Sequence, residues 1–255
     1  MNTIWKGRIA PLLVRWQLRR LLNDPVPINR LFGQAVLLKS GKMDEEDFRT
    51  NLERFYREMS PEGCREQVEF HKKKKRLSQP GSYKVDVTAL RDDPSADPHR
   101  GKLDLWARRF GLLQYMGIRS DVLILRAGEQ IPPHGHSGVV SGFYVLEGQV
   151  AIRHFDRIQE RPGRVMLRKS VDATLGAGQY TTNSECRQNI HWLLGIAASS
   201  YLFRFTVTEV PVKRFGLARG DRSRIYVDPT AEPDAEGLIC APYISEAEAK
   251  LLQFV

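Results

Sequence analysis

The stretch Gly128-Glu129-Gln130-Ile131-Pro132-Pro133-His134-Gly135-His136 decides the fold. Residues i and i+2 of an extended strand point to the same face, so the imidazoles of His134 and His136 can meet one ion. His191 follows 55 residues after His136, in another β-like stretch, Asn189-Ile190-His191-Trp192. Imidazole binds Fe, Zn, Cu and Ni alike, so ligand type alone does not choose the metal. The three histidines are predicted to hold one metal ion.

Short β-rich stretches separated by Gly and Pro surround these histidines. They cover residues 121–126, 142–146, 149–155, 165–171, 179–182, 190–196 and 201–207. Several short strands at near-regular spacing are typical of a sandwich or a closed barrel. The tail adds the stretches 224–229 and 237–242 and a short final helix from Ser245. The fold is therefore expected to be mainly β.

The histidine stretches resemble the two motifs of the cupin superfamily. The first motif is a Gly, five residues, His-x-His, an acid and a later Gly, and Gly128 and Gly148 match its glycines. Asn189-Ile190-His191 resembles the histidine of the second motif. Residues 131–156 together with Asn189–His191 are most similar to the thiol dioxygenase branch, particularly the cysteamine and plant N-terminal-cysteine oxidases. The resemblance covers residues 121–209, about a third of the chain, and implies a jelly-roll β-barrel.

Two positions depart from these patterns. Ser141 stands five residues after His136, where most cupins carry a metal-binding Glu, and Ser137 stands where the oxidases have Pro. Thiol dioxygenases also lack that Glu, so the resemblance implies a three-histidine site. It implies Fe(II) as the metal, with Zn, Ni or Mn as alternatives.

Three neutral ligands leave the ion its full +2 charge and open coordination positions. Such a site can take an anionic substrate, for example a thiolate, together with O2. Zn²⁺ at the same ligands would instead acidify a bound water and favour hydrolytic or lyase chemistry. The expected function is a metal-dependent oxygenase that uses Fe(II) and O2 on a small thiol or other anionic substrate. The alternatives are a non-catalytic cupin sensor or interaction protein with a helical partner-binding region, or a cupin acting on a sugar or carboxylic acid.

Two tyrosines are expected at the site as catalytic groups. Tyr180 lies near the second histidine stretch, and Tyr226 in the tail could fold over the mouth of the barrel. A tyrosine hydroxyl near the metal could orient O2 or donate a proton, whereas amphipathic packing is the alternative for both. Strand alternation counted from Ser141 turns Phe143 and Val145 inward, rather than the tyrosine between them.

Further polar residues have a structural and a functional interpretation. His154 is predicted to be an ordinary surface histidine, with a place behind the metal ligands as the alternative. Cys186 is predicted to be a passive buried thiol rather than a cap on the site. The carboxylate of a substrate could meet Arg108, Arg109 or Arg126, and the sequence does not choose among them.

The chain is predicted to have three regions. Residues 1–76 are read as a helical N-terminal region, 77–104 as a linker, and 105–255 as the barrel domain with a C-terminal extension. Asp44 opens an amphipathic run that includes Phe48 and Leu52 and stops at Ser60-Pro61. The first 22 residues are basic and read as a docking helix, with a transit peptide or a surface-seeking helix as the alternative.

Charge and cysteine usage limit which partners and which cellular compartment are expected. With 39 Lys+Arg against 30 Asp+Glu, the chain favours acidic partners without naming one. The run Lys72–Arg76 could bind nucleic acid, but a solvated helix end is preferred because no aromatic stacking platform accompanies it. A small-molecule substrate and O2 are the expected partners, and a homo-oligomer is compatible with the sequence.

Three widely spaced cysteines without a CxxC exclude a disulfide framework and a thiolate zinc site. This usage fits a reducing compartment, so a cytoplasmic location is expected. No run of about 18 apolar residues occurs, so no transmembrane span is expected.

Overall fold

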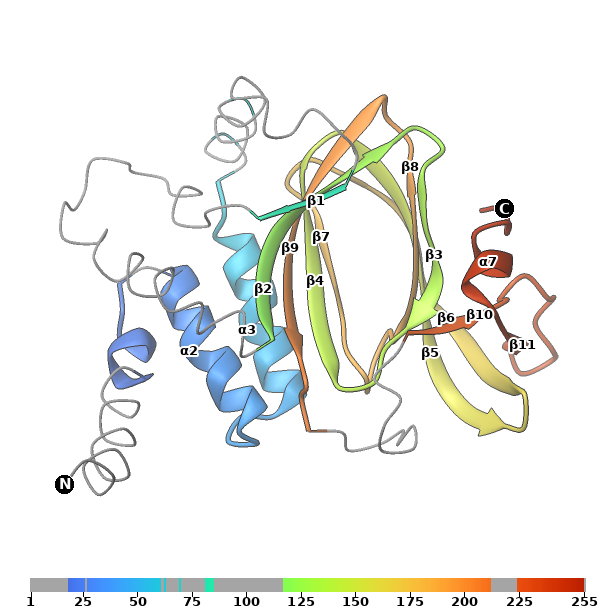
Figure 1. Ribbon diagram of the computed structural model, residues 1–255, viewed down its shortest axis with the longest axis horizontal. Helices are drawn as coiled ribbons and strands as arrows, with labels where there is room; N and C mark the ends of the chain where they lie inside the picture. The colour runs from blue at the N-terminus through green and yellow to red at the C-terminus, as the bar shows by residue number, and fades with distance from the viewer. Residues whose placement is uncertain are drawn as a thin grey trace, which may run out of the picture.

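Two antiparallel β-sheets form the body of the molecule (Figure 1). The computed structural model describes residues 18–25, 27–60, 62, 69, 81–84, 117–211 and 224–254. One sheet has five strands in the order β1-β2-β9-β4-β7, and the other closes into a barrel in the order β10-β11-β6-β5-β8-β3. The strands are β1 (Gly81–Lys84), β2 (Ile118–Arg126), β3 (Gln130–Gly135), β4 (Val139–Glu147), β5 (Gln149–Arg161), β6 (Arg164–Gly176), β7 (Tyr180–Asn183), β8 (Ile190–Gly195), β9 (Ser199–Thr208), β10 (Ile225–Val227) and β11 (Leu238–Ile244).

The predicted architecture is confirmed: the molecule is mainly β, with a closed barrel and an α-helical N-terminal extension. Each of the seven β-rich stretches predicted around the histidines falls on a strand, although β5 and β6 run on to Arg161 and Gly176 as a long hairpin. The stretch Gln130–Gly135 forms a strand of its own, β3, which carries His134.

Apolar side chains from the facing sheets fill the space between them. The strand β4 shows how alternation sorts the residues. Phe143 and Val145 join the core between the sheets, as predicted, whereas Tyr144 joins a second core on the outer face of the five-stranded sheet. One face of each strand in this sheet therefore looks into the barrel and the other toward the helices.

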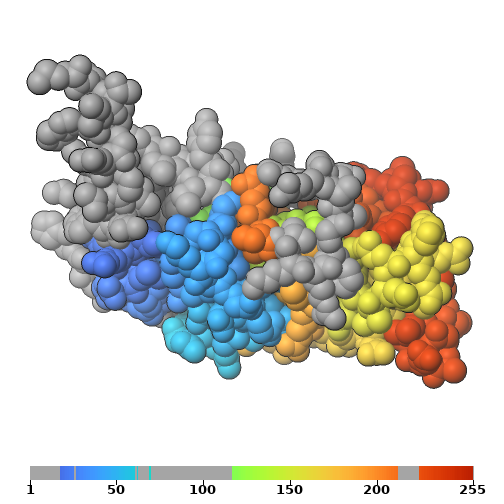
Figure 2. All heavy atoms as spheres, turned by 90° about the horizontal axis from the view of Figure 1, so that it is seen from below, coloured from blue at the N-terminus to red at the C-terminus, as the bar shows by residue number. Residues whose placement is uncertain are grey.

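The helices α2 (Pro27–Lys39) and α3 (Glu45–Arg57) cover that outer face (Figure 1). Asp44 caps α3 by accepting a hydrogen bond from the Glu46 backbone N–H at 2.9 Å, which fixes the helix start that the sequence predicts. Phe48 and Leu52 are fully buried against the sheet. In the space-filling view, the helices lie at one end of the molecule and the C-terminal strands at the other (Figure 2).

The C-terminal tail completes the barrel. Strand β10 pairs with β3, and β11 pairs with β6, so the tail closes the sheet that carries two of the histidines. The predicted final helix is α7 (Glu246–Ala249), and Ser245 caps it in a capping box with Glu248.

Several predictions lie outside the described residues. They concern most of the basic segment 1–22, the run Lys72–Arg76, nearly all of the linker 77–104, and Arg108 and Arg109. Within the predicted linker, Gly81–Lys84 form the short strand β1. Among the described helices, none has the length and apolar character needed to span a membrane.

Candidate metal centre

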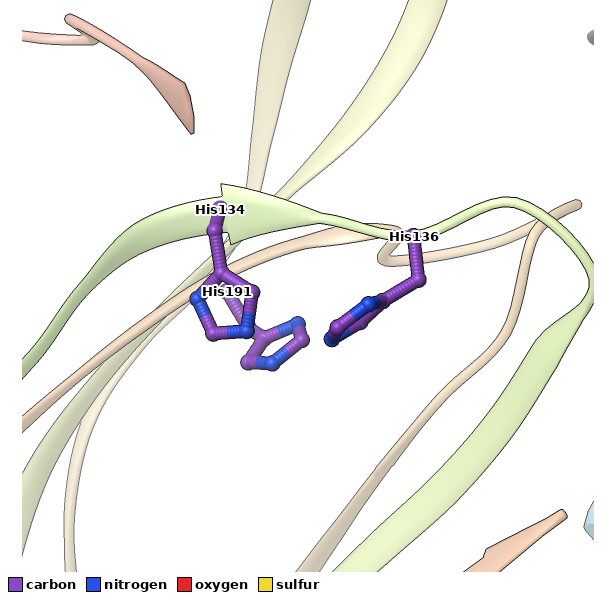
Figure 3. A group of neighbouring side chains, drawn as sticks. All are labelled: His134, His136 and His191. Atoms are coloured by element: carbon purple, nitrogen blue, oxygen red, sulfur yellow. The ribbon is translucent and has the colours of Figure 1, made fainter. Parts of the chain in front are cut away.

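His134, His136 and His191 meet inside the barrel, as Figure 3 shows. Their candidate ligand nitrogens all lie within 4.8 Å of one another. His134 belongs to β3 and His191 to β8, and the two residues are paired directly across these antiparallel strands. Directly opposed residues project to the same face, and His136 follows His134 by two. The strand pairing therefore brings His191 to the His134–His136 pair, although 55 residues separate it from His136.

The imidazole ring of His134 lies edge to face with the rings of His136 and His191. The ring centres of His134 and His191 are 4.2 Å apart, and those of His134 and His136 are 4.7 Å apart. His134 and His191 are each 2% exposed, whereas His136 is only partly buried. The group is therefore reached from the side of His136.

Hydrogen bonds to Nδ1 orient two of the rings. The Nδ1 atom of His134 lies 2.8 Å from the carbonyl oxygen of Pro132, and that of His191 lies 3.2 Å from the carbonyl oxygen of Asn189. A carbonyl oxygen only accepts, so Nδ1 of His134 carries the proton in its contact, whereas Nδ1 of His191 also lies 2.8 Å from the side-chain amide nitrogen of Asn183, which donates. The Nε2 atom of His134 is then free of a proton and available to an ion.

The environment keeps the three rings neutral. Burial holds the pKa of His134 and of His136 well below the usual value, and positive neighbours act in the same direction. Burial lowers the pKa of His191 to about 4, although the Asn189 carbonyl opposes this shift. Neutral imidazole is the form that binds a metal, so the rings need no deprotonation at neutral pH.

The donor set fits a first-row metal ion. Metal–nitrogen bonds of about 2.0–2.1 Å place two imidazole nitrogens that share an ion roughly 3 Å apart. The candidate nitrogens lie within 4.8 Å of one another, so the rings would have to approach one another to share an ion. Three neutral nitrogens are compatible with Fe(II) and equally with Zn²⁺ or Ni²⁺, so the ligands leave the metal open.

Ser141 on β4 stands five residues after His136. Its side chain is 4% exposed, and its hydroxyl lies 2.5 Å from Oδ1 of Asn183 on the neighbouring strand. Within the described part of the chain, no acidic side chain joins the three histidines. The centre is therefore a group of three neutral donors.

Two arginines place positive charge beside the histidines. Arg204 on β9 forms a two-point ion pair with Asp121, with distances of 2.8 Å and 2.5 Å. Arg224 precedes β10, whose residue Ile225 is paired with Gly135. Both arginine charges contribute to lowering the pKa of the neighbouring histidines, Arg224 at all three and Arg204 at His136 and His191.

Arg126, one of the three arginines considered as a carboxylate anchor, lies elsewhere. It is the exposed last residue of β2, and its backbone N–H donates to Glu129. Asp121, near the start of the same strand, forms the ion pair with Arg204, and the charge of Arg204 acts on the histidines. Among the described residues, Arg224 and Arg204 are the arginines whose charges act on the three histidines.

Tyr226 is the predicted tyrosine that lies beside the histidines. It is paired with His134 across β10 and β3, and the two ring centres are 5.9 Å apart. The pKa of the nearby Glu246 carboxyl is lowered chiefly by Lys250 and in smaller part by Tyr226. Tyr226 thus lies between the histidine group and helix α7.

Tyr180 lies on the opposite face of its strand. Its ring is 5.6 Å from that of Tyr56 on α3, and it packs against the core beneath the helices. Its strand neighbours Thr181 and Asn183 contact His154 and His191 instead. This placement favours packing for Tyr180 and does not favour a catalytic role.

His154 is buried in the barrel, so its prediction as a surface histidine is wrong. It is 0% exposed, and on β5 it is paired directly with His191. The two ring centres are 6.2 Å apart. The strand alternation that places His191 inside also places His154 inside, since opposed residues share a face.

Cys186 contacts helix α3. Its backbone N–H donates to Glu45 Oε1 at 3.0 Å, and its thiol lies 3.8 Å from the other carboxylate oxygen. The thiol is half-buried. This fits the passive role that the sequence suggests better than a cap on the histidines.

Comparison of the sequence with protein-family models and with curated proteins finds no match. Among solved structures, the chain is similar to procruciferin, an 11S globulin from Brassica napus, with 10% identity and a TM-score of 0.32 over 41% of this chain and 24% of that one. It is similar to an oxalate oxidase with 14% identity and a TM-score of 0.29, covering 37% and 44% of the two chains.

A third similarity is to the Cnp3 cupin domain of Schizosaccharomyces pombe, with 13% identity and a TM-score of 0.28, covering 36% and 56% of the two chains. In all three comparisons the chain spans less than two thirds of the known structure's length. Similarity of this extent does not establish an activity, a substrate or a metal for this chain.

Proposed function

We propose that the chain is a metal-dependent cupin oxygenase that uses Fe(II) and O2 on a small thiol or another anionic substrate. The observation that carries this proposal is the group of three neutral histidines with Ser141 in place of a carboxylate. An ion held by His134, His136 and His191 keeps its full positive charge. It is then best complemented by a ligand that brings a negative charge of its own.

The charges around the group support an anionic substrate. Arg224 is exposed and acts on all three histidines. The charge of Arg204 is largely matched by Asp121, which lies 2.5 Å away. A positive mouth raises the local concentration of anions and favours their entry.

The barrel interior supplies a dry environment for the reaction. Phe143, Val145 and Leu193 are buried between the sheets, and the ring centre of Phe143 is 6.0 Å from that of His191. An apolar surround limits water and strengthens the electrostatic interactions of a bound anion. The ion would supply a site where substrate and O2 can be held together, and Tyr226 would hold or donate a proton beside His134.

The alternative of a non-catalytic interaction protein loses part of its support. The apolar faces of α2 and α3 are buried against the five-stranded sheet. Among the described residues, these helices leave no apolar face for a partner. Residues of the N-terminal region outside the described ranges are the remaining ground for that alternative.

Metal analysis tests the centre. Protein purified without added metal is expected to carry about one ion per chain, and His134→Ala, His136→Ala or His191→Ala should each bring the content to background. Elemental analysis measures the content, and circular dichroism of each variant checks that the fold is retained. If all three variants keep the ion, the proposed centre is wrong.

Oxygen consumption tests the reaction. Iron-loaded protein should consume O2 with at least one member of a panel of cysteine, cysteamine and peptides with N-terminal cysteine. The same panel with His191→Ala serves as the blank. Iron-loaded protein that turns over none of these substrates would contradict the thiol assignment, and zinc or nickel as the co-purified metal would favour hydrolytic or other cupin chemistry.

Tyr226→Phe separates catalysis from binding of the ion. The variant removes one hydroxyl and keeps the ring beside His134, so metal content should be unchanged. If the hydroxyl transfers a proton, kcat should fall by roughly 100-fold or more. Tyr180→Phe is the matched control and should leave kcat near the wild-type value, because Tyr180 packs under α3.

A further inference from the structure

His136 is the histidine of the group that lies outside the strands. It follows Gly135, the last residue of β3, and belongs to the connection that leads to β4, as Figure 3 shows. Its ring centre is 5.6 Å from that of His191, whereas the ring centre of His134 is 4.2 Å from it. Strand pairing places His134 and His191, so other contacts must place His136.

A buried carboxylate contacts the two residues that follow His136. Glu185, in the connection between β7 and β8, is 2% exposed. Its Oε2 accepts a hydrogen bond from the backbone N–H of Gly138 at 2.6 Å, and its Oε1 accepts from the Ser137 hydroxyl at 3.4 Å. A buried carboxylate is costly unless it is hydrogen-bonded, so these contacts fix Glu185 and the histidine connection to each other.

A second side chain from the same β7–β8 connection holds His136 itself. Asn189 is 2% exposed, and its amide nitrogen donates to the carbonyl oxygen of His136 at 2.7 Å. Its amide oxygen lies 3.4 Å from the guanidinium of Arg157, whose side chain is fully buried. The stretch 136–138 is therefore held by Asn189 at its start and by Glu185 at its end.

The β7–β8 connection is itself fixed to neighbouring elements. The backbone N–H of Cys186 donates to Glu45 Oε1 on α3 at 3.0 Å, and that of Gln188 donates to Asp156 Oδ1 on β5 at 2.6 Å. Both contacts follow Glu185 within three residues. Glu185 thus approaches the histidine connection from a support that is already held in place.

We propose that Glu185 is a positioning residue, which holds residues 137–138 and so aims the His136 ring at the ion. This inference rests on the proposed metal centre. Glu185 acts behind the ligands, because the candidate ligand group among the described residues consists of His134, His136 and His191. Polar groups behind metal ligands commonly fix the orientation of those ligands, and their loss weakens metal binding.

Four variants separate hydrogen bonding from charge and from general loosening. Glu185→Ala removes both contacts. Glu185→Gln loses the charge but keeps an oxygen for the Gly138 N–H and an NH2 group for Ser137, whereas Glu185→Asp keeps the charge on a side chain that is one methylene shorter. Glu45→Ala is the matched control, because Glu45 is also a buried carboxylate and contacts the same β7–β8 connection at Cys186.

Two readouts follow the centre without turnover. Competition with a chelating dye measures Zn²⁺ affinity, and the visible absorption of Co²⁺-loaded protein reports the coordination geometry. Glu185→Ala should weaken Zn²⁺ affinity by roughly 10- to 100-fold and alter the Co²⁺ absorption. Glu185→Asp should change both readouts in the same direction, whereas Glu185→Gln and Glu45→Ala should stay close to wild type.

Wild-type Zn²⁺ affinity and Co²⁺ absorption in Glu185→Ala would overturn the proposal. An equal loss in Glu45→Ala would also overturn it, because loosening of the β7–β8 connection would then be the cause. An equal loss in Glu185→Gln would overturn it as well, because the charge of Glu185 would then be what matters.

The variants also keep this inference distinguishable from the proposed function. Circular dichroism checks the fold of each variant, and Glu185→Asp decides if Glu185→Ala does not fold. Wild-type protein that binds neither ion would overturn the proposed centre and the role of Glu185 with it. Wild-type protein that binds both ions, loses them in Glu185→Ala and turns over no substrate would contradict only the proposed reaction.

Discussion

At the scale of single residues, the spacing of the histidine pair depends on the glycine within it. A Cβ atom at Gly135 would lie 2.3 Å from Oδ1 of Asn189 and 2.6 Å from Cδ1 of Ile190. Asn189 uses this approach to donate from its side chain to the backbone carbonyl of His136 at 2.7 Å. Gly135 therefore lets β8 lie close enough to fix the backbone on which the second histidine is carried.

His154 should make stability depend on pH. Burial, together with the charges of His191 and Arg49, lowers its pKa to about 3, while in the unfolded chain it is about 6.5. Between these two pH values, His154 binds a proton in the unfolded chain but not in the folded chain. The free energy of unfolding is thus undiminished above pH about 6.5 and falls with acidification by about 1.4 kcal/mol per pH unit.

Urea unfolding of the metal-free protein between pH about 6 and about 4 measures this slope. In His154→Leu the slope should decrease by about one proton relative to wild type, because one buried neutral imidazole is gone. An identical slope in the two proteins would show that His154 takes up a proton in the folded state.

The sequence predicts the histidine group better than its surroundings. His134 and His136 are two residues apart, so the pattern of a single strand is enough to place both on one face. Asn183, by contrast, contacts Ser141, which is 42 residues away in sequence, and His191, which lies on another strand. No local sequence pattern predicts either contact. Arg224 reaches the site only because the tail adds β10 beside β3.

At the scale of elements, apolar alternation predicts the strands that line the core. It gives β4 its inward Phe143 and Val145, both of which lie between the sheets. It does not give strand length at the β5–β6 hairpin, where residues 158–161 at the end of β5 and residues 172–174 near the end of β6 are exposed. These strands are held by their pairing with each other and by the pairing of β6 with β11. The second pairing joins residues that are distant in sequence, so local alternation does not predict it.

The C-terminal tail is fastened to the strands that carry the histidines. Gln130 on β3 accepts a hydrogen bond from Trp192 on β8 at 2.8 Å, and its amide donates to the carbonyl of Leu252 at 2.9 Å. The ring of Phe254 lies 5.0 Å from that of Trp192, and the Arg153 guanidinium lies 4.5 Å above the Phe254 ring. The tail therefore clamps β3, β8 and β5 from outside the barrel.

Removing the Phe254 ring should loosen this clamp. Phe254→Ala loses an aromatic pair of about 0.5–1.5 kcal/mol and a cation–π contact of about 0.5–1 kcal/mol. The free energy of unfolding in urea should fall by roughly 1–2 kcal/mol. Leu251→Ala is the control, because Leu251 is 82% exposed and its removal should cost little. Equal effects of the two substitutions would mean that the ring contacts contribute nothing.

At the scale of the whole molecule, the N-terminal helices and the barrel share one core. Leu52 and Tyr56 on α3 lie over Gly142 of β4, where a Cβ atom would come within 3.0 Å of Leu52 Cδ2 and 2.7 Å of the Tyr56 ring. Amphipathic spacing predicts that this helix buries one face, but a single sequence does not say which surface receives it. Gly142 on β4 leaves the space into which Leu52 and Tyr56 pack. This role can be recognised only after the helix has been placed against the sheet.

A shared core predicts that α3 and the five-stranded sheet unfold together. Leu52 is fully buried, so Leu52→Ala should lower the free energy of unfolding by about 2–5 kcal/mol through lost burial and the cavity left behind. Hydrogen exchange should show the protection of amides in α3 and in β4 falling by the same amount, because both belong to one cooperative unit. Thr50→Ala, at an exposed position of the same helix, should leave both sets of amides unchanged. Faster exchange confined to α3 would instead mean that the helix opens by itself while the barrel and its histidine group stay folded.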